Sequence, residues 1–130
     1  MIKIPKTIIE KIIEHSKIDF PIEACGYLIG NDDTVIDIIK MTNTDKSNEH
    51  FTFDPKEQFN AVKYARQKGA KLIAVYHSHP ASPARMSQED IRFANDTSMK
   101  YLIYSVSEDK LKCFSIDKEK NVTVEEIIPL

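Results

Sequence analysis

The spacing of hydrophobic residues along this chain is typical of helices in some segments and of strands in others. Near its start, isoleucines recur three and four positions apart, at Ile8, Ile9, Ile12 and Ile13. This spacing predicts an amphipathic helix from Lys6 to about His15. A second helix is predicted from Asp54 to about Lys68, because an aspartate N-cap precedes a proline and Gly69 supplies a C-terminal stop. A third, shorter helix is predicted from Ser87 to about Asn95.

Runs of apolar, often β-branched residues between turn residues predict the strands of a sheet. They cover Glu23–Gly30, Thr34–Met41, Phe51–Phe53, Lys71–Tyr76, Tyr101–Val106, Leu111–Ile116 and Val122–Ile128. The turn at Asn31–Asp33 joins the first two runs into a hairpin, and the last three form a meander. A glycine within the first run indicates a bulge or a close approach of two backbones. This order predicts one α/β domain, residues 1–130, with a mixed central sheet flanked by helices.

Composition fits a globular domain and narrows the classes of function. With 42% hydrophobic and 29% charged residues, the chain has the make-up of one ordinary domain that buries a real core. A net charge of −2 provides no basic field, so we expect neither nucleic acid nor an anionic membrane as a partner. Met1–Pro5 lacks the pattern of a signal peptide, and no apolar run is long enough to span a bilayer. Cys25 and Cys113 form no CxxC pair, which favours a reduced, cytoplasmic protein.

The residues with metal-binding or catalytic chemistry gather just after the predicted strand 71–76. His77 and His79 are two positions apart, so their side chains point the same way if they end that strand. Pro80 stops the strand, and after a loop Ser87 begins a helix whose first turn holds Asp90. Two imidazoles and one carboxylate can therefore converge above the strand end. Three such ligands with an open fourth position are typical of a catalytic zinc site.

Each of these residues also has a purely structural interpretation. A strand-end histidine pair is more often polar surface than a metal site. Ser87 and Asp90 match a capping box, which stabilises a helix start by about 0.5–2 kcal/mol without any metal. Glu23 is as consistent with an edge residue facing water as with a catalytic group. The capping box, however, leaves His77 and His79 unexplained.

Other polar or reactive side chains are predicted to lie in the core or on the solvated surface and not in a functional site. Cys25 shares the parity of Glu23 and is favoured as a small buried residue; the alternative is a fourth zinc ligand that closes the site. His15 and His50 lie in polar stretches and are predicted to be solvated. Lysines near the C-terminus are interleaved with acids and predict a solvated face, not a binding patch. They are Lys110, Lys112, Lys118 and Lys120.

The spacing of the histidines, the serine and the aspartate resembles the signature of a known family. His77–Pro80, six further residues, Ser87, two residues and Asp90 match HxHPx6SxxD of the JAMM (MPN-plus, JAB domain) zinc metalloproteases with no deviation. The segment Glu23–Gly26 resembles that of the family's small stand-alone prokaryotic members. The order of predicted elements also agrees over nearly the whole chain. The resemblance implies the family's curved, cytidine-deaminase-like central sheet.

That resemblance implies a role for each residue of the pattern. His77, His79 and Asp90 are implied to be the ligands of one zinc ion per chain, with water as the fourth ligand. Glu23 is implied to be the general acid/base that takes a proton from this zinc-activated water. Ser87 is implied to steady the oxyanion of the tetrahedral intermediate. This mechanism forms no covalent intermediate, so it requires no nucleophilic cysteine.

The resemblance also implies a substrate. The family hydrolyses peptide or isopeptide bonds after the C-terminal glycines of ubiquitin or ubiquitin-like proteins. The likeness to its small prokaryotic members implies that the substrate here is a ubiquitin-like sulfur-carrier protein. The loops Thr42–His50 and Pro80–Met86 are expected to grip this tail, which adds as a strand beside the site. The alternative is a non-catalytic MPN-type binding or scaffold module. A zinc deaminase is largely excluded, because the chain lacks H-x-E with P-C-x-x-C. A homodimer through the apolar residues 127–130 is left open.

Overall fold

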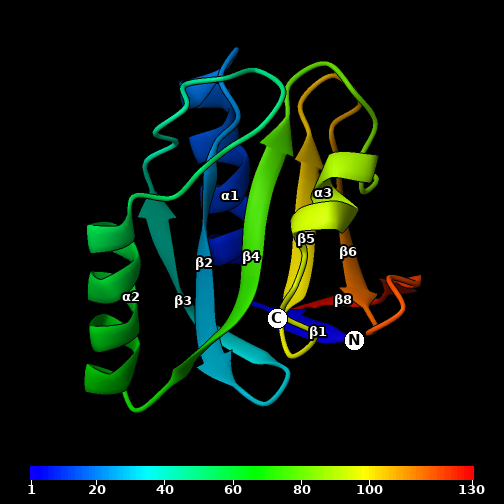
Figure 1. Cartoon of the computed structure of the whole chain (residues 1–130). Coiled ribbons are helices and arrows are strands. Elements are labelled where there is room, and N and C mark those ends of the chain that lie inside the picture. Colours follow the sequence, from blue (N-terminus) through cyan, green and yellow to red (C-terminus); the bar gives the residue numbers. More distant parts are fainter.

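The computed structural model describes all 130 residues and consists of one eight-stranded sheet with three helices (Figure 1). The strands are β1 (Ile2–Ile4), β2 (Cys25–Asn31), β3 (Thr34–Met41), β4 (Lys71–His79), β5 (Lys100–Ser105), β6 (Lys110–Ile116), β7 (Val122–Glu125) and β8 (Ile127–Pro129). The helices are α1 (Lys6–Asp19), α2 (Pro55–Gln67) and α3 (Gln88–Phe93). None of them is both long and apolar enough to cross a bilayer.

The sheet is mixed and curved, as predicted. Its strands follow the order β7-β6-β5-β4-β2-β3-β1-β8. β1 pairs in parallel with β3 and β8, and β4 with β5, whereas the other neighbours are antiparallel. β7 and β8 stand at opposite ends of this order, although only Glu126 separates them in the chain. The end of the chain therefore brings both edges of the sheet together and nearly closes it.

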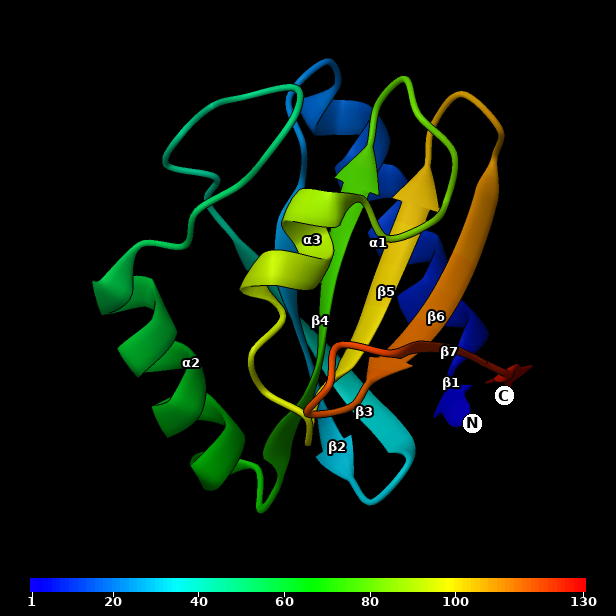
Figure 2. The same ribbon diagram turned by 45° about the vertical axis from the view of Figure 1, so that its right-hand side comes forward.

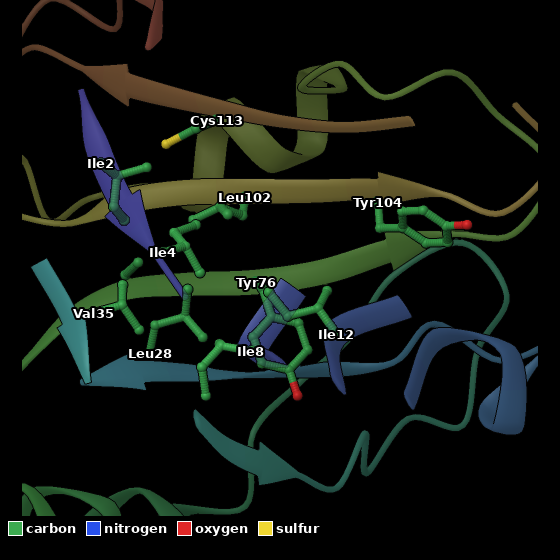
Figure 3. Packing of buried hydrophobic residues seen from close by; sticks show 11 residues of the cluster. Ile2, Ile4, Ile8, Ile12, Leu28, Val35, Tyr76, Leu102, Tyr104 and Cys113 are labelled. Atoms are coloured by element: carbon green, nitrogen blue, oxygen red, sulfur yellow. The ribbon is translucent and has the colours of Figure 1, made fainter. Parts of the chain in front are cut away.

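Helices cover both faces of the sheet. In Figures 1 and 2, α1 lies behind the strands, α3 lies in front of them and α2 lies beside them at the left. Alternation along β4 sends Tyr76 to the α1 face, where it packs in the main core with Ile8 and Ile12 (Figure 3). His77 consequently faces the other side, where Ala61 of α2 belongs to a smaller core. β4 thus separates a packed face from the face that carries the candidate ligands.

Gly26 allows two backbones and an aromatic ring to meet, as the glycine within the predicted strand indicated. It lies opposite Tyr76 in the β2–β4 pairing. A β-carbon at this position would lie 2.4 Å from Cε1 of Tyr76 and 2.5 Å from the carbonyl oxygen of Ile39. The Tyr76 ring is held in turn by His15, whose Nδ1 lies 2.7 Å from the tyrosine hydroxyl oxygen.

The prediction that His15 is solvated is wrong, because this residue is only 7% exposed. Position 15 continues the apolar stripe of Ile8 and Ile12 and therefore faces the sheet. His50 is exposed as predicted, and its Nδ1 lies 3.0 Å from a carboxylate oxygen of Asp45.

The end of the first predicted helix and the short strand predicted at Phe51–Phe53 differ from the structure. α1 continues to Asp19, because nothing breaks the helix before Phe20, whose backbone is extended ahead of Pro21. The predicted strand over 51–53 forms only an isolated bridge between Asn43 and Phe53.

The two ends of the chain form strands that the hydrophobic pattern did not separate. β1 was not predicted, since three residues are too few to show a period. The predicted strand over 122–128 breaks at Glu126 into β7, which pairs with β6, and β8, which pairs with β1. Ile127 of β8 packs against the main core. The apolar residues considered for a homodimer are therefore partly covered by the chain itself.

Candidate active site

Three side chains from β4 and α3 converge at the C-terminal end of β4. His77 and His79 share one face of the strand, and their Nε2 atoms lie 3.1 Å apart. The Asp90 carboxylate spans them, with Oδ1 3.2 Å from Nε2 of His77 and Oδ2 3.0 Å from Nε2 of His79. Donor atoms that share one tetrahedral zinc at bonds of about 2.0–2.1 Å stand about 3.3 Å apart. These three donors fit such an ion.

The orientation of His79 is set by a backbone carbonyl. Its Nδ1 lies 2.9 Å from the carbonyl oxygen of Pro83, which can only accept a hydrogen bond. Nδ1 therefore carries a proton, and in the neutral ring Nε2 keeps its lone pair for a metal. Burial opposes a charge on His79, but hydrogen bonds to Asp90 and Pro83 outweigh it and raise the pKa of the imidazole.

Asp90 is held as a carboxylate by the two histidines and, to a smaller extent, by the start of its own helix. Although burial opposes ionisation, hydrogen bonds from His77 and His79 keep the pKa of Asp90 well below its usual range. Its Oδ2 also accepts the backbone N–H of Ser87 at 2.9 Å, and Oγ of Ser87 accepts the backbone N–H of Asp90 at 3.0 Å. The capping box considered as an alternative is therefore present, and it aims the same carboxylate at both imidazoles.

Cys25 does not join this group of donors. It lies opposite His77 in the β2–β4 pairing, but its thiol is buried in the smaller core with Tyr27 and Met41. Burial raises the pKa of Cys25 to about 12. The two histidines and Asp90 are the one group of three or more potential metal ligands whose ligand atoms all lie within 4.8 Å of one another. The observed arrangement is thus an open three-donor site, and Cys25 is a buried core residue.

Glu23 lies just before β2 rather than within it, and the interpretation of Glu23 as a water-facing edge residue is wrong. The residue is 2% exposed, and its side-chain atom Oε1 has no hydrogen-bond partner. Burial raises the pKa of Glu23 to about 8, with His79 opposing this shift and Asp90 adding to it. The carboxyl group is therefore electrostatically coupled to His79 and Asp90, and its Oε1 is the one buried side-chain oxygen or nitrogen atom without a hydrogen-bond partner.

The backbone around Glu23 is fixed from two sides. Its N–H donates to the carbonyl of Ser47 at 2.9 Å, and its carbonyl accepts from Nδ2 of Asn43 at 3.1 Å. Ala24 follows, and its N–H donates to Oγ of Ser78 at 2.8 Å while its carbonyl accepts the Ser78 N–H at 2.9 Å. Sequence reasoning missed Asn43 and Ser78, because nothing local distinguishes an asparagine in a polar loop or the middle residue of HxH.

A cavity of about 770 Å³ opens beside the three donors. His77 and Asp90 line it together with the sheet, α2, α3 and the segment 45–53. Apolar and aromatic walls come from Tyr27, Phe51, Phe53, Val75, Met99 and Tyr101. Of the two loops expected to grip a substrate, the first contributes Asp45 and His50, whereas the second contributes only Met86.

Comparison with known proteins identifies relatives of this chain. It is 29% identical to a CysO-cysteine peptidase of Mycobacterium tuberculosis over 100 residues, which cover 75% of this chain and 68% of that protein. It is 28% identical to a probable TtuB-protein conjugate cleaving protease of Thermus thermophilus over 122 residues, covering 93% and 80% of the two chains. A solved structure from Desulfitobacterium hafniense is 42% identical, has a TM-score of 0.91 and is matched over 100% of this chain and 93% of its own.

The family model for prokaryotic homologs of the JAB domain matches residues 5–117, which include all five residues of the motif. This match spans most of the sheet, all three helices and the whole candidate site. The chain therefore belongs to the prokaryotic JAB-domain family, as its HxHPx6SxxD pattern predicted.

Proposed function

We propose that this protein is a zinc-dependent peptidase or isopeptidase. Its substrate is a ubiquitin-like protein of the sulfur-carrier type, cleaved after the C-terminal glycines. The convergence of two imidazoles and a carboxylate, with the unpaired Glu23 carboxyl nearby, is the observation that carries this proposal. Relatives named for CysO-cysteine and for TtuB-protein conjugates support the substrate class.

His77, His79 and Asp90 would hold the zinc ion. When bound, zinc supplies a Lewis acid and lowers the pKa of a coordinated water to about 7. The chain contributes a ligand set prepared in advance, since Pro83 fixes the tautomer of His79 and the helix cap fixes Asp90. Such supporting contacts are typically worth about 10–100-fold in metal affinity or activity.

Glu23 would move the proton from the water to the leaving amine. A pKa raised to about 8 by burial lets this carboxyl group exist in both protonation states near neutral pH. A cation held by the three donors would lower the pKa of Glu23 and favour its carboxylate form. General acid–base catalysis of this kind typically contributes about 10²–10⁴ in rate. The hydrogen bonds from Asn43 and to Ser47 hold the Glu23 backbone for this task.

Ser87 would donate its hydroxyl hydrogen to the developing oxyanion. Its Oγ already accepts the N–H of Asp90, so the cap uses a lone pair and leaves the hydrogen available. Removing one such donor from an oxyanion hole costs about 2.7–4 kcal/mol of transition-state stabilisation. The cap and the catalytic role are therefore compatible in one side chain.

The cavity beside the donors would receive the extended tail of the substrate. Its volume of about 770 Å³ and aromatic walls suit several residues of chain, and the segment 45–53 forms one side. We expect the tail to lie along this segment as an added strand. The second loop, which lines the cavity only through Met86, has a smaller part than the sequence suggested.

The scaffold alternative requires a site that has lost its ligands, whereas this chain keeps a complete donor set. Metal analysis of protein purified without chelator separates the two functions. A scaffold would carry no zinc and would gain no activity when zinc is added.

The decisive experiment incubates the zinc-loaded protein with sulfur-carrier proteins from the same cell, each extended by one amino acid. Mass spectrometry should show loss of the added residue, and the variant Glu23→Gln should show none while still binding zinc. A second substrate, in which the tail is joined to a lysine side chain, tests isopeptide cleavage. Intact masses for every substrate with the zinc-loaded protein would overturn the proposal.

A further inference from the structure

The helix that carries Asp90 has little to hold it in place. α3 spans only six residues, Gln88–Phe93, and none of them is fully buried. A helix this short is not stable by itself, because nucleation is costly and few backbone hydrogen bonds repay it. The position of α3, and with it the direction of the Asp90 carboxylate, therefore depends on contacts at the ends of the helix.

The C-terminal end of α3 is bound by a lysine from a distant turn. Nζ of Lys120, which lies between β6 and β7, is within hydrogen-bond distance of four oxygen atoms. They are the carbonyls of Ile91 (3.1 Å), Arg92 (3.3 Å) and Ala94 (2.9 Å) and Oδ1 of Asn95 (2.9 Å). The last carbonyls of a helix have no partner within it, and a cation there also offsets the negative end of the helix dipole.

The turn around Lys120 is built to present this side chain. The Lys120 N–H donates to the carbonyl of Asp117 at 3.0 Å. The Asp117 carboxylate accepts the backbone N–H groups of Glu119 at 3.0 Å and Asn121 at 2.8 Å. Lys120 itself has φ of 66°, in the left-handed region that favours glycine. A turn of this shape would accept glycine more readily, so the lysine is explained by what its ammonium group binds.

We propose that Lys120 is a positioning residue, which locks α3 against the β6–β7 turn and so holds Asp90 at the metal donors. The proposal rests on the proposed zinc site. The sequence placed Lys120 in a solvated face with Lys110, Lys112 and Lys118. Those three are exposed, whereas the Lys120 ammonium is engaged.

The variant Lys120→Gly tests the role of the ammonium group independently of the turn. Glycine suits the left-handed backbone conformation, so the substitution removes the side chain without straining the turn. Zinc affinity, measured by competition with a chromophoric chelator, should fall about tenfold, the lower range for supporting contacts. Amide hydrogen exchange of residues 88–93 in the metal-free protein should become faster. Lys120→Arg should keep part of the zinc affinity and part of the exchange protection that Lys120→Gly loses. Lys118→Met, at an exposed neighbour on the same turn, should change neither the zinc affinity nor the exchange rates.

The outcomes distinguish this inference from the proposed function. If the wild-type protein binds zinc and Lys120→Gly binds it equally well with unchanged exchange in α3, Lys120 is only a turn residue. If the wild-type protein binds no zinc, the proposed function fails. The exchange measurement then still shows whether Lys120 fixes α3, because it needs no metal. A loss of exchange protection across the whole sheet would instead indicate a general structural role and would also reject the proposal.

Discussion

The Ser87 hydroxyl oxygen accepts the backbone N–H of Asp90 at 3.0 Å, and the Asp90 carboxylate accepts the backbone N–H of Ser87 at 2.9 Å. The carboxylate oxygen in this pair, Oδ2, also lies 3.0 Å from Nε2 of His79. Helix capping and the orientation of a proposed metal ligand are thus one arrangement. Because α3 is short, the start of the helix fixes the ligand directly.

Substitutions at Ser87 should separate its two proposed roles. Ser87→Ala removes both the cap and the hydroxyl donor, so it should lower the free energy of unfolding by about 1 kcal/mol. It should also lower kcat by about 10²–10³-fold. Ser87→Gly is the matched control, because glycine caps a helix at a cost of only a few tenths of a kcal/mol but has no hydroxyl. Full activity in Ser87→Gly, measured beside urea unfolding, would leave Ser87 as a cap alone.

Glu23→Gln should lower kcat by at least about 10²-fold with little change in zinc content. Glutamine keeps the shape of the side chain but cannot take up the proton. Zinc content by elemental analysis and turnover of an extended sulfur-carrier protein are measured on the same sample. Glu14→Gln, at an exposed acid of α1 on the other face of the sheet, controls for the loss of one negative charge. Retained turnover in Glu23→Gln would remove this residue from the mechanism.

The buried Glu23 carboxyl should make the metal-free protein less stable as pH rises. Its folded pKa is raised to about 8, above the ordinary value, so the folded state binds more protons than the unfolded state across this interval. The contribution of Glu23 protonation to the free energy of unfolding is fully present below about pH 4. It is lost progressively until the pH passes about 8, a difference of a few kcal/mol. Urea unfolding of wild type and Glu23→Gln should show the variant gaining relative stability from pH 5 to 8. A constant difference would contradict the raised pKa.

The motif and the sheet were predictable because each depends on local signals. His77 and His79 show their common direction through period two, and Ser87 with Asp90 shows a helix start through spacing alone. The hydrophobic runs likewise located the central strands, since each carries its own period. For these residues, position in the chain determines position in space to within one strand or one helical turn.

The contacts that support the site were not predictable, because they join segments with no local pattern. Lys120 reaches α3 across 28 or more positions of sequence, and Ser78 reaches Ala24 across 54. Glu23 had two interpretations that only its burial separates. β8 could be predicted only from the curvature of the whole sheet, since its partner β1 lies at the opposite end of the chain.

Gly26→Ala should destabilise the protein by about 1–3 kcal/mol, the usual cost of overpacking a core. The added methyl group would lie 2.4 Å from the Tyr76 ring, which is anchored through its hydroxyl to His15. Urea unfolding measures the loss. In a Tyr76→Leu background, which removes part of the ring, the same substitution should cost less than in wild type. Equal costs in both backgrounds would show that the contact with Tyr76 is not the cause.

Asn43 should couple the wall of the cavity to Glu23. This buried amide makes hydrogen bonds to five backbone groups: the carbonyls of Glu23, Ser47 and His50 and the N–H groups of Asp45 and Thr52. Asn43→Ala leaves these groups without their partner, which costs about 1–3 kcal/mol for a buried group. It should lower kcat, because the Glu23 backbone loses one of its supports, and raise KM, because the segment 45–53 lines the cavity.

Thr44→Ala is the matched control for Asn43→Ala. Thr44 lies next in the chain and makes one exposed side-chain hydrogen bond, to the carbonyl of Thr52 at 3.0 Å. Its loss should leave kcat unchanged and shift KM by less than about twofold, in line with the small effect of exposed substitutions. Steady-state kinetics with an extended sulfur-carrier protein would resolve both parameters. If Asn43→Ala raised KM alone, the asparagine would shape the substrate groove without positioning the Glu23 carboxyl group.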